Sequence, residues 1–236
     1  GLREVEVYER PDVAVVPTGE ELVQDDPGPG EVVETNGLTI SRLAQRWGAS
    51  TRYEDVVTDD EDALADAIEA NVDADIIVTT GGSSVGERDL IPEVVGDLGE
   101  VFVHGVALRP GHPVALGEVA GTLVVMLPGY PVACIVNAVQ FLRPALQRAG
   151  GMPLEAPPSA RAKLEGKVRS EPGVRTFARV RLREADGETV AEPVSASGSG
   201  VLSSVALADG WVVVPEQTEG FDAGEDVAVE NWEGQL

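Results

Sequence analysis

The sequence has 236 residues, 43% of them hydrophobic, and its 41 acidic residues outnumber 17 basic ones to give a net charge of -24. This length and composition indicate a globular chain of two domains and exclude the disordered class, and the lack of a basic stripe excludes nucleic acid as a partner. Because the acids are scattered over predicted helix faces and loops, we expect a solvated acidic surface and a halophilic, cytoplasmic protein.

Up to about residue 150, short β-branched runs alternate with amphipathic stretches, which predicts parallel strands joined by crossover helices. The expected strands, in chain order, are DVAVVP (12–17), YEDVV (53–57), DIIVTT (75–80), a pair formed by VFVHGVAL (101–108) and VALG (114–117), and TLVVML (122–127). Four helices are expected. The first begins near Asn36 and ends at Gly48, with Leu38, Ile40, Leu43 and Trp47 on or near one apolar face. The second covers 59–72 with Thr58 as its cap, the third covers 90–98, and the fourth starts near Pro131 and has a kink or bulge at Pro144.

The segment GMPLEAPPSA, residues 151–160, holds three prolines and no periodicity, so we place a domain boundary there. Beyond it the pattern changes to alternation in TFARVRLRE, TVAEPV, GWVVVPE and DVAVENW, separated by glycine turns. The predicted organisation is therefore an α/β domain over 1–150 and a small all-β domain over 151–236.

One uncharged stretch, Val119–Leu142, is long enough to cross a bilayer as a single helix. Pro128, Gly129 and Pro131 near its middle divide it into a strand and a helix, so we expect no membrane contact. No signal peptide is visible and the chain opens with Gly1, which leads us to expect a fragment or a processed chain.

Three predicted strand-to-helix corners carry unusual residues: PTGEEL after the first strand, TTGGSSVG after DIIV, and LPGYP after TLVVM. The carboxyl ends of parallel strands share one edge of a sheet, so the three corners can face one cleft. Gly81, Gly82 and Gly86 would let amide groups approach a ligand, Ser83 and Ser84 add hydroxyls, and the helix near Pro131 offers N–H groups to an anion. The pattern predicts a phosphate site.

Carboxylates surround these corners. Glu21, Asp59 and Asp89 would repel a bare phosphate, but they fit as ligands of a Mg²⁺ ion that bridges them to it. Arg109, just before PGHP, supplies a permanent cation for bidentate phosphate contact.

Each feature also has a simpler interpretation. The glycine pair fits a tight turn, the acids at 59–62 fit a capped helix start, and PGYP fits an ordinary turn. His104 and His112 fit packing or hydrogen bonding better than zinc, and Cys134, the sole cysteine, fits core packing and excludes an internal disulfide. Composition and spacing alone give an anion-binding α/β domain.

Taken together and in order, these motifs resemble the MoeA and gephyrin E-domain family of molybdopterin molybdenumtransferases. The resemblance rests on TGEEL, TNGLTISRLAQRWGA, TTGGSSVGERD, ALRPGHP and LPGYP, followed by GSGVLSSVALADGWVVVPE and AGEDVAVENW. It implies a three-layer, MogA-like α/β domain with a mostly parallel sheet, then a C-terminal β-barrel.

The resemblance implies insertion of molybdate or tungstate into adenylylated molybdopterin with release of AMP, and it implies Mg²⁺ as the divalent cation that assists this reaction. It assigns catalysis to Glu21, Asp59, Asp89 and Arg109, with the three acids also as metal ligands. It assigns substrate binding to Thr18, Gly19, Gly81, Gly82, Ser84, Gly86, Pro128, Gly129, Pro131 and Ser199.

Two positions depart from the family pattern, since His112 replaces a lysine of PGKP and Tyr130 replaces the asparagine of PGNP. The family also has two further N-terminal domains and a homodimeric active site completed by the partner subunit, and nothing in this sequence matches those domains. Two other functions stay open: a molybdopterin-binding or scaffolding module without turnover, and a MogA-type adenylyltransferase. The β-domain after residue 151 argues against the latter, which ends with the α/β domain.

Overall fold

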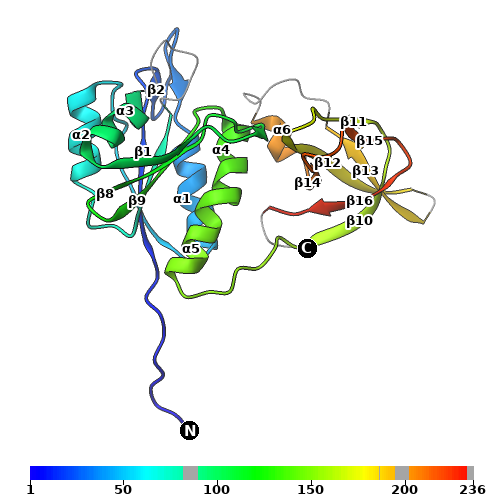
Figure 1. Ribbon diagram of the computed structural model, residues 1–236, viewed down its shortest axis with the longest axis horizontal. Coiled ribbons are helices and arrows are strands. Elements are labelled where there is room, and N and C mark those ends of the chain that lie inside the picture. Colours follow the sequence, from blue (N-terminus) through cyan, green and yellow to red (C-terminus); the bar gives the residue numbers. More distant parts are fainter. Residues whose placement is uncertain (82–89, 186, 195–201, 233–236) are drawn as a thin grey trace. The chain divides into compact units, whose positions relative to one another are not determined.

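The computed structural model describes residues 1–81, 90–185, 187–194 and 202–232. The chain divides into two compact units (Figure 1). The first unit comprises 1–104, 113–129 and 137–154, and the second unit comprises 105–112, 130–136 and 155–236. The predicted division at residue 151 stays a prediction, because two short segments before it, 105–112 and 130–136, belong to the second unit.

The first unit is built on a six-stranded, mostly parallel sheet, as predicted. β1 pairs in parallel with β4 and β5, β5 pairs in parallel with β9, and β8 runs antiparallel to both β9 and β6. The strands in spatial order are β4 (Ser50–Tyr53), β1 (Asp12–Pro17), β5 (Ile76–Thr80), β9 (Thr122–Leu127), β8 (Ala115–Val119) and β6 (Glu100–His104). The carboxyl ends of β1, β5 and β9 therefore lie in adjacent positions at one edge.

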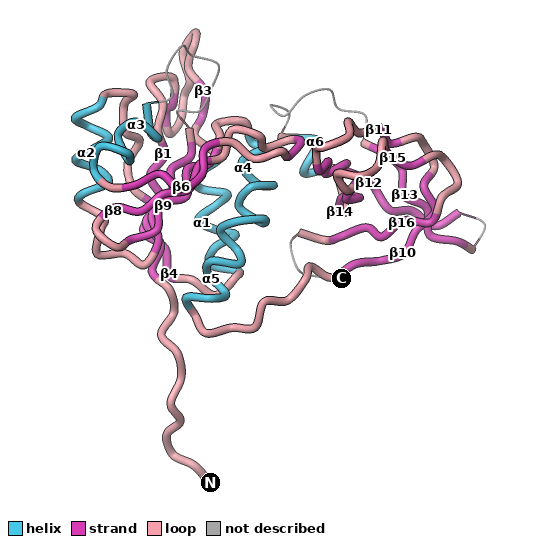
Figure 2. Tube along the Cα trace, in the orientation of Figure 1, coloured by secondary structure: helices cyan, strands magenta, loops and turns pink. Residues whose placement is uncertain are grey.

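Helices cover both faces of this sheet, which confirms the three-layer prediction (Figures 1 and 2). On one face, Leu64 and Ile68 of α2 (Glu61–Glu69) and Ile91 of α3 (Leu90–Leu98) pack in one core with Ala14 and Val16 of β1. The other face carries α1 (Asn36–Arg46), which contacts β1, β4 and β5.

The predicted last helix has three parts: α4 (Pro131–Asn137), a π-helical turn η1 (Ala138–Leu142) and α5 (Arg143–Ala149). Pro144 lies at the start of α5, directly after the π-helical turn. A proline has no N–H to donate to the preceding turn, so the irregularity predicted at Pro144 is confirmed as a bulge. Val119–Leu142 runs from the end of β8 through β9, α4 and η1, and none of the helices in the described ranges is long and apolar enough to cross a membrane.

Three local predictions were wrong. The second strand, expected over 53–57, is β4, which ends at Tyr53 because its register with β1 ends there, opposite Val15. The cap of α2 is Asp60 instead of Thr58, since the Asp60 carboxylate accepts the Ala63 N–H at 3.0 Å. Leu38, expected on the apolar face of α1, is 44% exposed.

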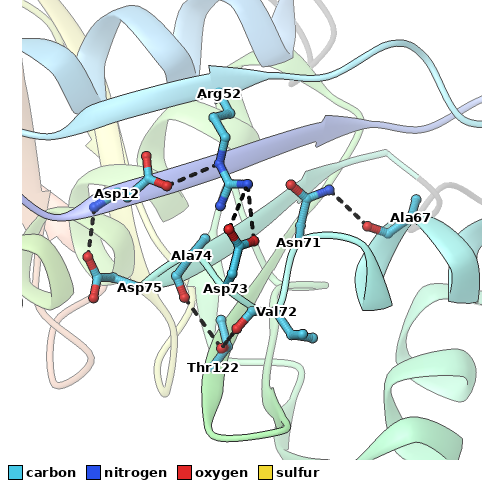
Figure 3. Close-up of polar contacts among 9 residues, drawn as sticks. All are labelled: Asp12, Arg52, Ala67, Asn71, Val72, Asp73, Ala74, Asp75 and Thr122. Carbon is cyan, nitrogen blue, oxygen red and sulfur yellow. Dashed lines mark hydrogen bonds and ion pairs between the residues drawn. The ribbon is translucent and has the colours of Figure 1, made fainter.

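At the amino ends of the strands, charged side chains pair with one another (Figure 3). The guanidinium of Arg52 lies 3.0 Å from Asp12 and 3.1 Å from Asp73. The Asp12 N–H donates to Asp75 at 2.8 Å, and the Thr122 hydroxyl donates to the Val72 carbonyl at 2.7 Å. These contacts link the amino ends of the strands, although the Nε and Nη2 atoms of Arg52 have no hydrogen-bond partner within the described residues.

The second unit contains a closed five-stranded barrel, as the family resemblance implied. β12 pairs with both β14 and β13 and so closes the ring. The strands in ring order are β13 (Glu188–Pro193), β10 (Ser159–Leu164), β16 (Asp226–Glu230), β14 (Gly210–Val214) and β12 (Arg175–Ala185). Trp211 is buried inside this unit, stacked on Trp232 at 4.7 Å and edge-on to Phe177.

Several short elements were not predicted. β10 begins inside the segment assigned to the linker, because two prolines immediately before Ser159 mask the alternation that follows. The other unpredicted elements are short: β2 (Leu22–Val23), β3 (Val32–Val33), β7 (Leu108–Arg109), β11 (Val168–Arg169), β15 (Gly220–Phe221) and α6 (Ser203–Ala206).

Candidate functional site

The ends of β1, β5 and β9, where the three predicted corners begin, meet at the carboxyl edge of the first unit's sheet. The Thr18 N–H donates to the Thr80 carbonyl at 3.4 Å, and the Gly81 N–H donates to the Leu127 carbonyl at 3.1 Å. A Cβ placed on Gly129 would lie 3.6 Å from the Gly81 Cα. The ends of β1, β5 and β9 therefore form one continuous surface, with Gly81 in the middle.

Gly81 is more tightly packed than Gly19 and Gly129, the other predicted site glycines in the described ranges. Its φ of +145° is rarely adopted by residues with a side chain, and a Cβ there would lie 2.0 Å from the Thr18 carbonyl oxygen. The backbones of the first and second corners thus approach closely, and no other residue fits at Gly81.

The acids of the first corner lie near Asp59. The pKa of the half-buried Asp59 is raised by burial and then by the negative charge of Glu21, and a backbone hydrogen bond from Glu20 opposes the rise. The Asp59 Oδ1 atom is buried and has no hydrogen-bond partner within the described residues. Such an orphaned oxygen beside a second carboxylate indicates a group that accepts a cation or a water.

Buried hydroxyls line the same strand ends. The Oγ1 atoms of Thr18, Thr79 and Thr80 are buried and have no hydrogen-bond partner in the described part of the chain. All three residues are at most 1% exposed. Since buried polar groups normally have partners, this edge carries unused hydrogen-bonding capacity.

Part of the predicted site lies outside the described residues: Gly82, Ser83, Ser84, Gly86, Asp89 and Ser199. Within the described ranges, no group of three His, Cys, Asp or Glu side chains could hold a metal ion. Two of the three predicted ligands, Glu21 and Asp59, are close enough to interact and offer the carboxylate oxygens that Mg²⁺ prefers. The donors present fit a magnesium ion, and the complete ligand set stays a prediction.

The third corner, Pro128–Pro131, is held by a residue that the sequence identified only as a helix start. The Asn36 side-chain amide donates to the Gly129 carbonyl at 2.7 Å, across 93 positions of sequence. Pro128 is buried and Pro131 opens α4. Nothing in the spacing of the motifs predicts this hydrogen bond.

A second feature missed by the sequence analysis is a buried carboxylate at the start of α1. Glu34 is 4% exposed, accepts the Gly37 N–H at 2.7 Å and the Leu38 N–H at 3.3 Å, and also accepts the Tyr53 hydroxyl. An acid before the first turn of a helix stabilises the unpaired N–H groups and the helix dipole. The acid at 34, two residues before Asn36, is the signal that could have revealed it.

Burial, the hydrogen bond to Glu34 and the charge of that carboxylate raise the pKa of Tyr53 from 10.0 to about 12. The phenol must stay protonated to donate, so its contribution to stability is complete below pH 10.0 and is lost as the pH rises toward about 12. We expect Tyr53→Phe to lower the free energy of unfolding at pH 8. Between pH 10 and pH 12, we expect the free energy of unfolding to fall less in the variant than in the wild type. Urea unfolding across this range checks it, with Tyr8→Phe at an exposed phenol as the control; parallel curves for wild type and Tyr53→Phe would contradict it.

Arg109 belongs to β7 in the second unit, where β7 pairs with β12. Its guanidinium forms an ion pair with Glu171 at 2.8 Å, and both side chains are exposed. In the same unit, the exposed His112 ring lies 2.8 Å from the Val106 carbonyl through Nδ1, in agreement with the hydrogen-bonding interpretation. The role of Arg109 in catalysis stays a prediction.

The second unit also has a surface pocket that the sequence did not predict. The Arg181 guanidinium donates to the Leu207 carbonyl at 3.2 Å on its rim. Its lining mixes one cation, one anion, hydroxyls and apolar groups: Arg181, Glu192, Pro193, Val194, Ser203, Ser204 and Leu207. This mixture selects no single class of ligand.

Comparison with known proteins bears on both units. Residues 14–148 match the family model described as a probable molybdopterin binding domain, and residues 161–232 match the MoeA C-terminal region, domain IV. These two matches correspond to the α/β and barrel parts of the chain.

Individual relatives agree with these matches. The chain is 34% identical over 97% of its length to molybdopterin molybdenumtransferase 2 of Mycobacterium tuberculosis, covering 58% of that protein, and 32% identical over 97% to the molybdopterin molybdenumtransferase of Staphylococcus aureus, covering 56%. The crystal structure of a molybdopterin biosynthesis MoeA protein from Pyrococcus horikoshii superposes with a TM-score of 0.83 at 36% identity, covering 96% of this chain and 55% of that one. The chain thus spans little more than half the length of these relatives.

Proposed function

The chain belongs to the MoeA family, with a molybdopterin-binding domain followed by the MoeA C-terminal region. We therefore propose that it binds adenylylated molybdopterin and inserts molybdate or tungstate with release of AMP. The observation that supports the proposal most strongly is the meeting of three strand ends around Gly81, together with the half-buried carboxylate of Asp59, whose Oδ1 atom has no hydrogen-bond partner in the described residues. Both the oxyanion and the pterin nucleotide are substrates in this reaction.

The residues of the carboxyl edge suit a phosphoanhydride. Beside Gly81, the Cβ position of Gly129 meets no atom of the described residues nearer than 3.6 Å, which leaves space for phosphate oxygens, and the unpaired hydroxyls of Thr18 and Thr80 are available to donate to them. Glu21 and Asp59 would hold a Mg²⁺ ion, which when bound neutralises phosphate charge and polarises the phosphorus for hydrolysis. Held in this way, the nucleotide keeps its pterin dithiolate in a fixed position for the oxyanion.

Several parts of the proposal concern the wider protein. We propose Asp89 as the third metal ligand, Ser199 as a substrate contact in the second unit and Arg109 as a phosphate contact. We also propose that the full-length protein is a cytoplasmic homodimer. The net charge of -24 leads us to propose that it comes from a halophile.

A molybdopterin-binding or scaffolding module without turnover stays the second candidate function. A MogA-type adenylyltransferase is less well supported, since residues 161–232 match the MoeA C-terminal region and such an enzyme would end with the α/β domain.

The test is AMP release from adenylylated molybdopterin by this chain in concentrated salt with Mg²⁺. The proposal predicts release that rises when molybdate or tungstate is added. Mg²⁺-dependent binding of the nucleotide without release would instead support the binding module, and the absence of both binding and release would contradict both functions.

A further inference from the structure

We propose that Asn36 is a positioning residue that fixes the Pro128–Pro131 turn against the Gly81 corner. This inference rests on the proposed function for its ligand, but its structural part stands on contacts among Asn36, Gly81 and Gly129, which all belong to the first unit. The Asn36 amide donates to the Gly129 carbonyl at 2.7 Å and so joins the start of α1 to the end of β9.

The position of Asn36 is itself fixed by contacts of the neighbouring residues Glu34 and Gly37. Glu34, buried one residue before the Thr35 cap, accepts the first free N–H groups of α1 and the hydroxyl of Tyr53 on β4. A Cβ on Gly37 would lie 2.9 Å from the Pro17 side chain and 3.0 Å from the Tyr53 ring, so the helix start lies directly against the ends of β1 and β4. Asn36 therefore projects from a rigid point of the sheet edge.

The hydrogen bond acts on the one stretch of the third corner that can reorient. Pro128 and Pro131 have fixed φ angles, whereas the peptide between Gly129 and Tyr130 can rotate. A peptide unit is planar, so holding the Gly129 carbonyl also sets the direction of the Tyr130 N–H. Within the described residues that N–H donates no hydrogen bond, and Gly129 lies beside Gly81, so Asn36 determines how this backbone meets a ligand at the corner.

The informative variant is Asn36→Asp. It keeps the shape of the side chain, and an acid in the first turn favours a helix, but the carboxylate cannot donate to the Gly129 carbonyl. The matched control is Asn71→Asp, where a 6% exposed asparagine also donates to a backbone carbonyl, Ala67, at 3.0 Å. Asn71 lies at the amino ends of the strands, away from the site (Figure 3).

Two readouts separate positioning from simple stability. Backbone order parameters of the Gly129 and Tyr130 amides, the two amides between the prolines, are measured by NMR relaxation without ligand; we expect them to fall from about 0.85 to below about 0.6 in Asn36→Asp and to stay unchanged in Asn71→Asp. The Mg²⁺-dependent affinity for adenylylated molybdopterin is expected to fall about tenfold in Asn36→Asp alone, at a loss of thermal stability no larger than in the control.

Unchanged order parameters in Asn36→Asp would overturn the inference, as would lowered order parameters with wild-type affinity. If the wild-type chain binds no adenylylated molybdopterin, the proposed function fails, and with it the role of Asn36 toward that ligand. The order parameters would still decide whether Asn36 holds the turn, so the two failures are distinguishable.

Discussion

Replacing Asp59 with asparagine is expected to abolish Mg²⁺-dependent binding of adenylylated molybdopterin while slightly stabilising the ligand-free chain. The Asp59 carboxylate is half-buried beside Glu21, and both burial and that charge raise its pKa above 3.8. A carboxyl group whose pKa is raised on folding opposes folding once the pH exceeds its unfolded value, so a neutral amide relieves that cost at pH 7. Loss of a metal ligand should reduce affinity on the order of 100-fold or more, at or beyond the effect of removing an outer-shell partner.

The control is Asp60→Asn, which removes the same charge one residue along the chain. Asp60 caps α2 through its side chain, and asparagine caps a helix as well as aspartate does. Isothermal titration with and without Mg²⁺, paired with urea unfolding, measures both effects. A variant Asp59→Asn that retained Mg²⁺-dependent affinity would remove Asp59 from the metal site.

The largest effect on stability is expected for Gly81→Ala. A Cβ at residue 81 would lie 2.0 Å from the Thr18 carbonyl oxygen and 2.7 Å from the Thr18 hydroxyl, and the φ of +145° adds backbone strain. Neither β1 nor β5 can move away, because they are paired along their length inside the sheet. We expect a loss of at least about 4 kcal/mol in the free energy of unfolding, or a chain that does not fold.

The variant Gly121→Ala separates the effect of the clash with Thr18 from the effect of backbone strain at a positive φ. Gly121 also has a positive φ, +89°, but no atom lies within 4 Å of its Cβ position. That variant should lose only about 1–2 kcal/mol. The helical circular dichroism signal in urea follows the first unit, since the barrel is built of strands; equal losses in the two variants would show that the approach to Thr18 is not the limiting contact.

Much of the α/β architecture could be predicted because the signals were local. The runs at 12–17, 76–80 and 122–127 are apolar on both sides, as buried parallel strands must be, and Pro128 and Gly129 end the last of them clearly. β4 was misplaced because it is a half-exposed strand whose limits are set by its pairing with β1 and not by its own composition. β10 was missed for a similar reason, since its register with β16 decides where it begins.

The candidate site was predictable to the extent that it depends on topology. Parallel strands place Thr18, Gly81 and Gly129 at one edge, and the structure brings these residues together. The hydrogen bond from Asn36 to Gly129 and the buried Glu34–Tyr53 pair could not be predicted, because each joins residues far apart in sequence through side-chain geometry. The ion pair of Arg109 with Glu171 depends in the same way on the pairing of β7 with β12.

The measurement that tests the central claim most directly is equilibrium binding of adenylylated molybdopterin to the wild-type chain and to Asp59→Asn, each with and without Mg²⁺. We predict that Mg²⁺ tightens binding to the wild type and has no effect on the variant. Binding of equal strength in all four conditions, or binding that Mg²⁺ strengthens equally in both proteins, would contradict a metal-assisted phosphate site at the carboxyl edge of the sheet.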